Sequence, residues 1–413
     1  MTASIAAAYR AAWLFPVAGP PIRDAVLEVD AGGRIADIRS GRDRGAFDLG
    51  RAAIVPALVN AHIHLEFSDR TVPIAPAKPF SGWVRNVVAH RRSRTEPIEA
   101  ILSHGIDELR RCGTVAAGEI ATVDTEHYQT PSIDLTLFRE IIGPLRVHWP
   151  ALLDDAERHL TEVRTSRLSP GLSPHAPHTV PQDLFEQTID LAARYAAPVA
   201  VHLAETVDEL SLLRERNGDL VALMRSMGLW DASAHPLGRR PLDWLQELTR
   251  APRALVVHGN YLDAKELDFL AESQSLSLVY CPRTHAYFGH PPHPFQKLLE
   301  RGGRVALGTD GRSSNPDLNL WREAEFVSRQ HPGLPSGTIL DLVTRAGAEA
   351  LGVGDRHGVL SVGRSANFVV VPLANDADGG DPPDLFAMVR PELRAFQNGI
   401  ELDRHDAGMP CRA

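Results

Sequence analysis

Short apolar segments rich in β-branched residues recur eight times between about residue 54 and residue 310, and segments with helical periodicity separate them. Strands that alternate with helices form parallel sheets through right-handed crossovers, and eight such units close a (β/α)8 barrel. We therefore predict an α/β fold with a TIM-like (β/α)8 barrel. The expected strands are 54–59, 114–117, 145–149, 168–172, 198–203, 254–257, 276–280 and 304–307, with helices at 97–112, 181–195 and 263–273.

The chain is longer than one barrel requires, since it has 413 residues. Extended runs with glycine turns occur near both termini, so we predict a small β-sandwich domain to which both ends contribute. The expected domains are the N-terminal part of the small domain (1–53), the barrel (54–354) and the C-terminal part of the small domain (355–413). The expected terminal strands are 25–29, 34–38, 358–360, 367–372 and 393–396, and 375–383 is expected to be a surface loop.

Composition excludes several classes of function. The formal net charge is -9, which argues against binding of nucleic acid, because phosphate binding needs a clustered basic patch. No apolar stretch approaches the roughly 20 residues that span a bilayer, and no signal peptide is recognisable, so we expect a cytoplasmic protein that does not bind membranes. Cys112, Cys281 and Cys411 are too scattered for a zinc site. A metal ion would have to be held by histidine and carboxylate.

Two histidines follow the first expected strand, His62 and His64. Residues i and i+2 of a strand point to the same face, so both imidazoles can contact one metal ion, although an H-x-H pair alone also fits a polar loop. In a barrel, the C-terminal strand ends meet at one mouth. The other polar residues at or after expected strand ends are Glu119, His148, His175, His202, His258, Arg283 and Asp310.

Three imidazoles and a carboxylate suit Zn²⁺ or Fe²⁺ and leave a coordination position open for water. Each residue also has an ordinary interpretation: a histidine can be a core or loop residue, and Asp310 can cap a strand or a helix. Glu205 lies three residues after His202 and would reach a substrate on the metal, or would be an exposed residue at a helix start.

Several motifs in order resemble the amidohydrolase superfamily, in the branch that holds nucleoside deaminases and chlorohydrolases. They are PALVNAHIHLEFS (56–68), SPHAPHT (173–179), VHLAET (201–206), VVHGN (256–260), GTDGRSSNPDLNLW (308–321) and GVLSVGRSANFVVV (358–371).

The resemblance implies that His62, His64, His202 and Asp310 bind one divalent ion, with Zn²⁺ expected first and Fe²⁺ as the alternative. It also implies that Glu205, His258 and Asp310 are catalytic. Members with two metals usually bridge them with a lysine or glutamate after the fourth strand. None of the three lysines, Lys78, Lys265 and Lys297, follows an expected strand.

The implied reaction is hydrolytic deamination of an adenine-type nucleoside, with 6-amino-6-deoxyfutalosine as one candidate. A divalent ion brings the pKa of bound water from about 15.7 to about 7, and the resulting hydroxide attacks the carbon that bears the amine. Glu205 would protonate the adjacent ring nitrogen, while Asp310 takes a proton and His258 orients the hydroxide. The alternatives are hydrolysis of an amide or of a substituted triazine, and an inactive barrel with a binding role.

The expected partner is a small-molecule substrate, and a homodimer is expected because relatives are often dimers. His175 would contact the ribose or base. Arg283 would pair with a substrate carboxylate or with a neighbouring acidic side chain. Trp83 would cover the substrate or anchor a helix. The chain departs from the family pattern at Gly311, where relatives often carry serine, and in the 281–290 loop, which lacks an asparagine-rich segment.

Overall fold

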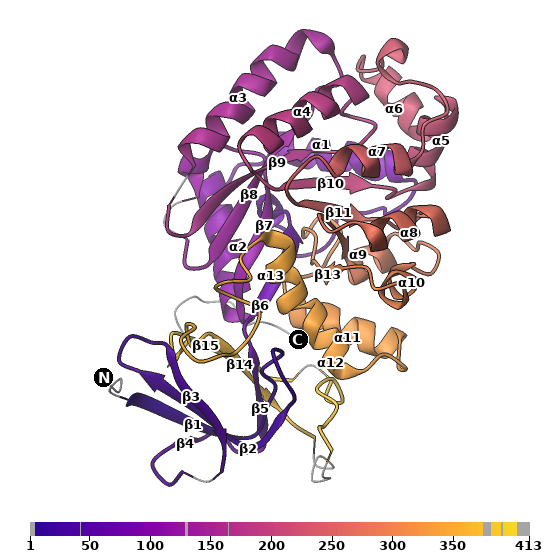
Figure 1. Ribbon diagram of the computed structural model, residues 1–413. Helices are drawn as coiled ribbons and strands as arrows, with labels where there is room; N and C mark the ends of the chain where they lie inside the picture. The colour runs from indigo at the N-terminus through magenta and orange to yellow at the C-terminus, as the bar shows by residue number, and fades with distance from the viewer. Residues whose placement is uncertain are drawn as a thin grey trace.

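The computed structural model describes residues 5–41, 43–128, 131–163, 165–374, 381–389 and 391–402. Its larger domain is a barrel of eight parallel strands that are hydrogen-bonded in chain order (Figure 1). The barrel closes where the Asp310 amide donates to the His62 carbonyl, at 3.1 Å. The strands are β6 (Leu58–Ile63), β7 (Thr114–Ala121), β8 (Asp134–Ile141), β9 (Leu168–Pro174), β10 (Val199–Leu203), β11 (Ala254–His258), β12 (Leu276–Tyr280) and β13 (Val305–Leu307).

Helices cover the outside of this barrel (Figure 1). Along the described chain they are α1 (Phe80–Ser93), α2 (Ile98–Arg111), α3 (Trp149–Glu162), α4 (Gln182–Arg194), α5 (Val207–Glu215), α6 (Asp219–Ser226), α7 (Pro241–Leu248), α8 (Ala264–Glu272), α9 (Pro282–Tyr287), α10 (Phe295–Glu300), α11 (Leu320–Gln330), α12 (Ser336–Leu342) and α13 (Arg345–Leu351). No helix in these ranges is long and apolar enough to cross a membrane.

Phe138 of β8 fills the barrel interior beneath the strand ends. A Cβ atom at Gly171 would lie 2.7 Å from the Phe138 ring, and one at Gly118 would lie 3.1 Å from it, so glycine at both positions makes room for the phenyl group. The floor is therefore packed, and the polar side chains above it are confined to the C-terminal end of the barrel.

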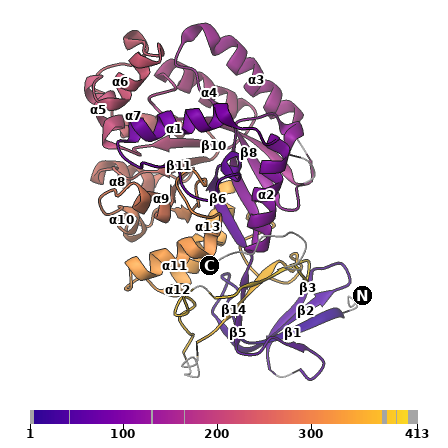
Figure 2. The same ribbon diagram turned by 180° about the vertical axis from the view of Figure 1, so that it is seen from behind.

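The terminal domain is one mixed sheet built from both ends of the chain (Figure 2). Two strands separate Tyr9 from Phe396 in the sheet, yet their rings contact each other at a centroid distance of 5.3 Å. The sheet is therefore strongly curved. The expected β-sandwich is therefore one continuous mixed sheet in the structure, and its strands from both termini share an apolar core. Its strands are β1 (Ile5–Leu14), β2 (Ile22–Asp30), β3 (Ile35–Ser40), β4 (Phe47–Asp48), β5 (Ala52–Pro56), β14 (Phe368–Pro372), β15 (Arg394–Gln397) and β16 (Ile400–Glu401).

The third barrel strand is β8 and not the expected segment 145–149. That segment forms a 3-10 turn at Arg146–His148 that leads into α3, so the prediction of a strand ending at His148 was wrong. The Trp149 indole donates to the Gly143 carbonyl at 2.7 Å, and Pro150 lies in the first turn of α3. The apolar residues of segment 145–149 therefore belong to the start of a helix, where proline is favoured.

Smaller corrections apply near the termini. The expected first strand, 54–59, spans the end of β5 and the start of β6, which belong to different sheets. No strand forms at 358–360, whereas β14 and β15 confirm the two later runs. Residues 375–380 of the predicted surface loop lie outside the described residues.

Candidate active site

The four predicted metal ligands meet at the C-terminal end of the barrel. His62 lies in β6 and His64 directly follows that strand. His202 comes from β10 and Asp310 from the segment after β13, and all four are buried. Nε2 of His64 lies 3.2 Å from Nε2 of His202. The Asp310 Oδ1 atom lies 3.6 Å from Nε2 of His62 and 3.7 Å from Nε2 of His64. The side chains thus form a compact cluster of donor atoms.

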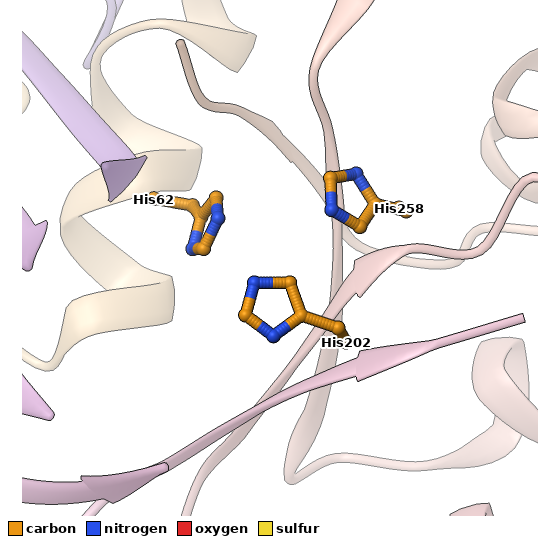
Figure 3. A group of neighbouring side chains, drawn as sticks. All are labelled: His62, His202 and His258. Atoms are coloured by element: carbon orange, nitrogen blue, oxygen red, sulfur yellow. The ribbon is translucent and has the colours of Figure 1, made fainter. Parts of the chain in front are cut away.

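The donor atoms of this cluster suit a cation. Both ring nitrogens of His62 and Nδ1 of His64 are buried and make no hydrogen bond to the described residues, which is costly without a partner. His62 and His202 point toward one another with His258 beside them (Figure 3). The donor atoms of two overlapping trios, His62–His64–Asp310 and His62–His202–His258, each lie within 4.8 Å of one another. The residues therefore fit a divalent ion.

The protonation states of the cluster match metal binding. Burial lowers the pKa of His202 to about 3 and lowers the pKa of His64 well below its usual value, so both imidazoles are neutral. Nδ1 of His202 bonds the His175 carbonyl at 2.9 Å, which leaves Nε2 with its lone pair facing the cluster. Burial alone would raise the pKa of Asp310, but the adjacent His62, His64 and His258 lower it, so the carboxylate stays ionised.

Asp310 is held by its own loop. Its backbone is left-handed, with φ of 57°, a conformation that non-glycine residues rarely adopt. The Gly311 amide donates to Oδ1 at 2.8 Å, and the Ser314 hydroxyl donates to Oδ2 at 3.0 Å. Gly311 itself leaves room for β6, since a Cβ there would lie 2.9 Å from Cβ of His64. Residue 311 is a glycine and has no hydroxyl, and in this chain the hydroxyl that contacts the Asp310 carboxylate comes from Ser314.

Glu205 and His258 lie beside the ligand cluster, with 3.7 Å between Glu205 Oε1 and His258 Nε2. Burial, followed by the charges of Asp310 and Glu209, raises the pKa of Glu205 well above its usual value. Its surroundings therefore favour the protonated carboxyl over the carboxylate. Burial also lowers the pKa of His258 well below its usual value, so its ring is neutral.

The backbone of the Glu205 loop is fixed by Glu209 of α5. One Glu209 oxygen accepts from the Ala204 amide at 2.7 Å and the other accepts from the Glu205 amide at 3.1 Å. Thr206 caps the helix by accepting from the Glu209 amide. Glu209 was not among the residues predicted from the sequence, although Thr206-x-x-Glu209 is the capping-box pattern of a helix start.

Glu119 supports the segment that follows the two histidines of β6. It lies at the end of β7 as expected, fully buried, and accepts hydrogen bonds from the Leu65 amide at 2.9 Å and the Tyr128 hydroxyl at 2.8 Å. Burial raises the pKa of Glu119 well above its usual value. One of its hydrogen bonds goes to the residue that follows His64, so Glu119 fixes the backbone of this turn.

His175 and Trp83, two of the expected substrate contacts, differ in their surroundings. The His175 ring lies at the mouth, with its centroid 5.1 Å from that of His202. Trp83 of α1 packs edge-on against Phe288 at 5.0 Å, and its indole nitrogen donates to the Ser313 carbonyl at 3.3 Å. It therefore links a helix to the loop after Asp310.

Arg283 forms ion pairs with neighbouring acidic side chains, as one of its two sequence interpretations expected. Its Nε donates to Glu323 at 2.6 Å and its NH2 donates to Asp317 at 2.7 Å. The side chain is 12% exposed and that of Glu323 is fully buried. The guanidinium is thereby held in an ion-pair network behind α9 and is not directed to the ligand cluster by any of these bonds.

The fold and the cluster define the class of the protein. Residues 53–395 match the model of the amidohydrolase family, so the chain belongs to this family. It is 28% identical over 363 residues to a 5-methylthioadenosine/S-adenosylhomocysteine deaminase of Syntrophobacter fumaroxidans, covering 81% of this chain and 75% of that protein. It is also 28% identical over 337 residues to an aminodeoxyfutalosine deaminase of Deinococcus radiodurans, covering 78% and 79%.

A solved structure confirms the architecture. The Helicobacter pylori aminofutalosine deaminase in complex with methylthio-coformycin superposes with a TM-score of 0.81, over 96% of this chain and 100% of that one. The two sequences are 20% identical, a level at which the likeness shows the fold alone.

Proposed function

We propose that this protein is a metal-dependent hydrolase that deaminates an adenine-type nucleoside. The observation that carries the proposal is the position of Glu205, a buried carboxyl that lies beside a cluster of three histidines and one aspartate and whose pKa is raised by burial. Deamination of a heteroaromatic ring needs such a proton donor, because the ring nitrogen must accept a proton as the tetrahedral intermediate forms. The names of the relatives, methylthioadenosine and aminodeoxyfutalosine deaminases, agree with this chemistry.

His62, His64, His202 and Asp310 would hold one divalent ion, with Zn²⁺ expected first and Fe²⁺ as the alternative. When bound, the ion supplies hydroxide at neutral pH by lowering the pKa of water. A single ion is expected because β9 ends in Pro174 and none of the lysines lies at a barrel strand end: Lys265 is in α8, Lys297 in α10, and Lys78 precedes α1.

The protein groups divide the proton transfers between them. Glu205 donates its proton to the ring nitrogen next to the carbon that bears the amine. Asp310 takes the proton of the attacking nucleophile, and His258 orients that nucleophile. The carbon gains the water oxygen and loses the amine as ammonia, so water and the aminopurine give the oxopurine and ammonia. His175 and Trp83 are proposed to contact the substrate from the mouth.

An ammonia-release screen tests the proposal. Purified protein loaded with Zn²⁺ or Fe²⁺ is given adenosine, 5′-deoxyadenosine, 5′-methylthioadenosine, carboxylated adenine nucleosides, simple amides and chlorinated triazines. We expect ammonia from adenine nucleosides together with the absorbance change of the purine ring. Ammonia from amides alone, or chloride from triazines alone, would replace the deaminase assignment with the other class.

Two finer proposals rest on the resemblance and on composition. A homodimer is proposed, and light scattering of the purified protein tests it by its mass. A cytoplasmic location is proposed as well, and fractionation of the source cells tests it.

A further inference from the structure

A cavity of about 490 Å³ lies at the end of the barrel opposite the ligand cluster. The loop after α13 forms part of its wall, together with residues at or just before the starts of four neighbouring strands. These residues include Thr136 of β8, Ser169 of β9, Pro198 before β10 and Arg253 before β11. Binding sites for small molecules have volumes of about 300–1,000 Å³, so the cavity has room for one such ligand.

The side chains of Thr136 and Ser169 face the barrel axis below the packed floor. Thr136 lies two residues before Phe138 on β8, and Ser169 lies two residues before Gly171, whose Cβ would meet the Phe138 ring. Neither hydroxyl makes a hydrogen bond to the described residues, and both residues line the cavity. Because Phe138 lies above them, the cavity is separate from the ligand cluster.

Arg253 brings an unpaired cation to the cavity. Its NH1 atom lies 2.7 Å from the place that a Cβ of Gly352 would take, so the guanidinium packs against the loop after α13. The side chain is half-buried and makes no hydrogen bond or ion pair with the described residues. Burial lowers the pKa of Arg304, Glu349 raises it, and the charge of Arg253 lowers it further, so the two arginines lie close enough to repel each other.

Arg356 adds a second cation to the wall of the cavity. Its NH1 atom lies 2.5 Å from Oδ2 of Asp134, a carboxylate that is also contacted by Arg167 and His357. The Nε and NH2 groups of Arg356 make no hydrogen bond to the described residues. None of the described residues that line the cavity is acidic. The charge of the cavity is therefore positive, and its free polar groups are mainly donors.

The donor set suits a phosphate better than a carboxylate. Arg253, the free N–H groups of Arg356 and the two hydroxyls approach from different walls. A phosphate monoester offers three acceptor oxygens in a tetrahedral arrangement, whereas a carboxylate offers two in one plane. Apolar side chains line another part of the cavity, among them Leu160, Val353 and the ring of Tyr195.

We propose that this cavity is a second small-molecule site, which binds a phosphate monoester with an apolar body. Arg253 and Arg356 pair with the phosphate, the hydroxyls of Thr136 and Ser169 donate to it, and the apolar wall contacts the ester group. The site lies at the opposite end of the barrel from Glu205 and takes no part in the proposed deamination. Binding is measured without turnover, so the test is independent of the proposed function.

Titration calorimetry of the metal-loaded protein gives the first test, with phenyl phosphate as the probe and benzoate and phenol for comparison. We expect one saturable site for phenyl phosphate, with benzoate at least about 10-fold weaker, because it makes fewer charge-assisted hydrogen bonds. Phenol should not bind measurably. No saturable binding of phenyl phosphate would overturn the proposal, and tighter binding of benzoate would overturn the choice of a phosphate.

Substitution of Arg253 locates the binding site, since phosphate also binds metal ions. Arg253→Met removes the guanidinium and keeps an apolar side chain, so the affinity for phenyl phosphate should fall at least about 10-fold. The control is Arg250→Met, three residues earlier, where an exposed arginine pairs with Glu247 at 2.5 Å and does not line the cavity. It should keep the wild-type affinity. Equal affinities in the wild type and Arg253→Met would show that the probe binds elsewhere and refute the proposal.

Thr136→Val repeats the test through a different group, and it decides the question where Arg253→Met does not fold. It replaces the hydroxyl by a methyl group of similar size, so we expect the affinity for phenyl phosphate to fall about 5–10-fold through one lost hydrogen bond. Thr161→Val, at an exposed threonine of α3 outside the cavity, is the control and should bind as the wild type does. Unchanged affinity in Thr136→Val would contradict the assignment.

Discussion

At the scale of single residues, Glu205 is the proposed proton donor of the site. Glu205→Gln removes the ionisable proton but touches none of the proposed ligands, so we expect full metal content and a loss of turnover of about 10²–10⁴-fold. His202→Ala removes a ligand atom that lies 3.2 Å from His64, so it should lose the metal as well. Elemental analysis and kcat separate the two effects. Equal metal content with full activity in both variants would contradict the assignment.

Gly311 is a second position where one atom decides the geometry. Gly311→Ser places a Cβ 2.9 Å from Cβ of His64 and 3.1 Å from its carbonyl oxygen, so the loop that carries Asp310 must move away from β6. We expect metal affinity to fall by about 10–100-fold, as for other changes that reorient a ligand. Competition with a chromogenic chelator measures the affinity.

Gly333→Ser is the control for this substitution, because a Cβ at Gly333 meets no atom within 4 Å and its φ is not left-handed. It should keep the wild-type affinity. Wild-type affinity in Gly311→Ser would mean that the loop accommodates the side chain without displacing Asp310.

At the scale of elements, Arg283 connects α9 to α11 through Glu323. Arg283→Met would leave the fully buried Glu323 carboxylate without its cation, so we expect the free energy of unfolding to fall by about 3–5 kcal/mol. The ratio of kcat/KM between carboxylated and uncarboxylated nucleosides should stay the same. Urea denaturation and the two rates measure these quantities.

Arg301→Met is the matched control, since it breaks an exposed pair with Asp268 and should cost at most about 1 kcal/mol. A selective loss of kcat/KM for carboxylated substrates in Arg283→Met, with stability unchanged, would restore the interpretation in which Arg283 binds a substrate carboxylate.

Elements differed in how far the sequence could predict them. Seven of the eight expected barrel strands overlap a barrel strand of the structure, because buried parallel strands read as apolar runs with turns beside them. The third failed because a helix start at Trp149 has the same apolar composition, while β8 alternates with polar residues such as Arg139. The proximity of His62, His202 and Asp310 was predictable because strand ends bring distant residues together.

The supporting residues were not predictable in the same way. Glu209 and Ser314 act through contacts with backbone amides or with another side chain, and their distances depend on loop conformations. Local sequence does not determine how such a loop packs against its neighbours. The spacing of Thr206 and Glu209 is typical of a helix start, but it does not indicate that the Glu209 oxygens accept from the Glu205 amide.

At the scale of the whole molecule, buried histidines and buried carboxyls have opposite effects on stability against pH. Burial lowers the pKa of His235 to about 4 and of His293 to about 3, so these rings take up protons on unfolding below about pH 6.5. Burial raises the pKa of Glu140 and of Glu209 to about 7, so these carboxyls release protons on unfolding above about pH 4.5. The two sets offset each other in mildly acidic solution, and a single substitution is needed to isolate one group.

His235→Phe isolates one such proton. The residue is 5% exposed and stacks on Trp230 at a centroid distance of 4.8 Å, a contact that phenylalanine preserves. In the wild type, the unfolded state binds this proton below about pH 6.5 and the folded state only below about pH 4. Proton binding therefore favours the unfolded state, and the free energy of unfolding decreases as the pH falls between these values. The variant should therefore show a slope of unfolding free energy against pH that is smaller by about 1.4 kcal/mol per pH unit in this window. Urea denaturation at several pH values, with a chelator present so that metal binding does not contribute, measures both slopes.

His104→Gln, at a histidine whose side chain is 64% exposed, controls for the loss of an imidazole at the surface. Identical slopes in the wild type and His235→Phe would mean that the ring is protonated equally in both states, and that its burial does not determine how the molecule responds to acid.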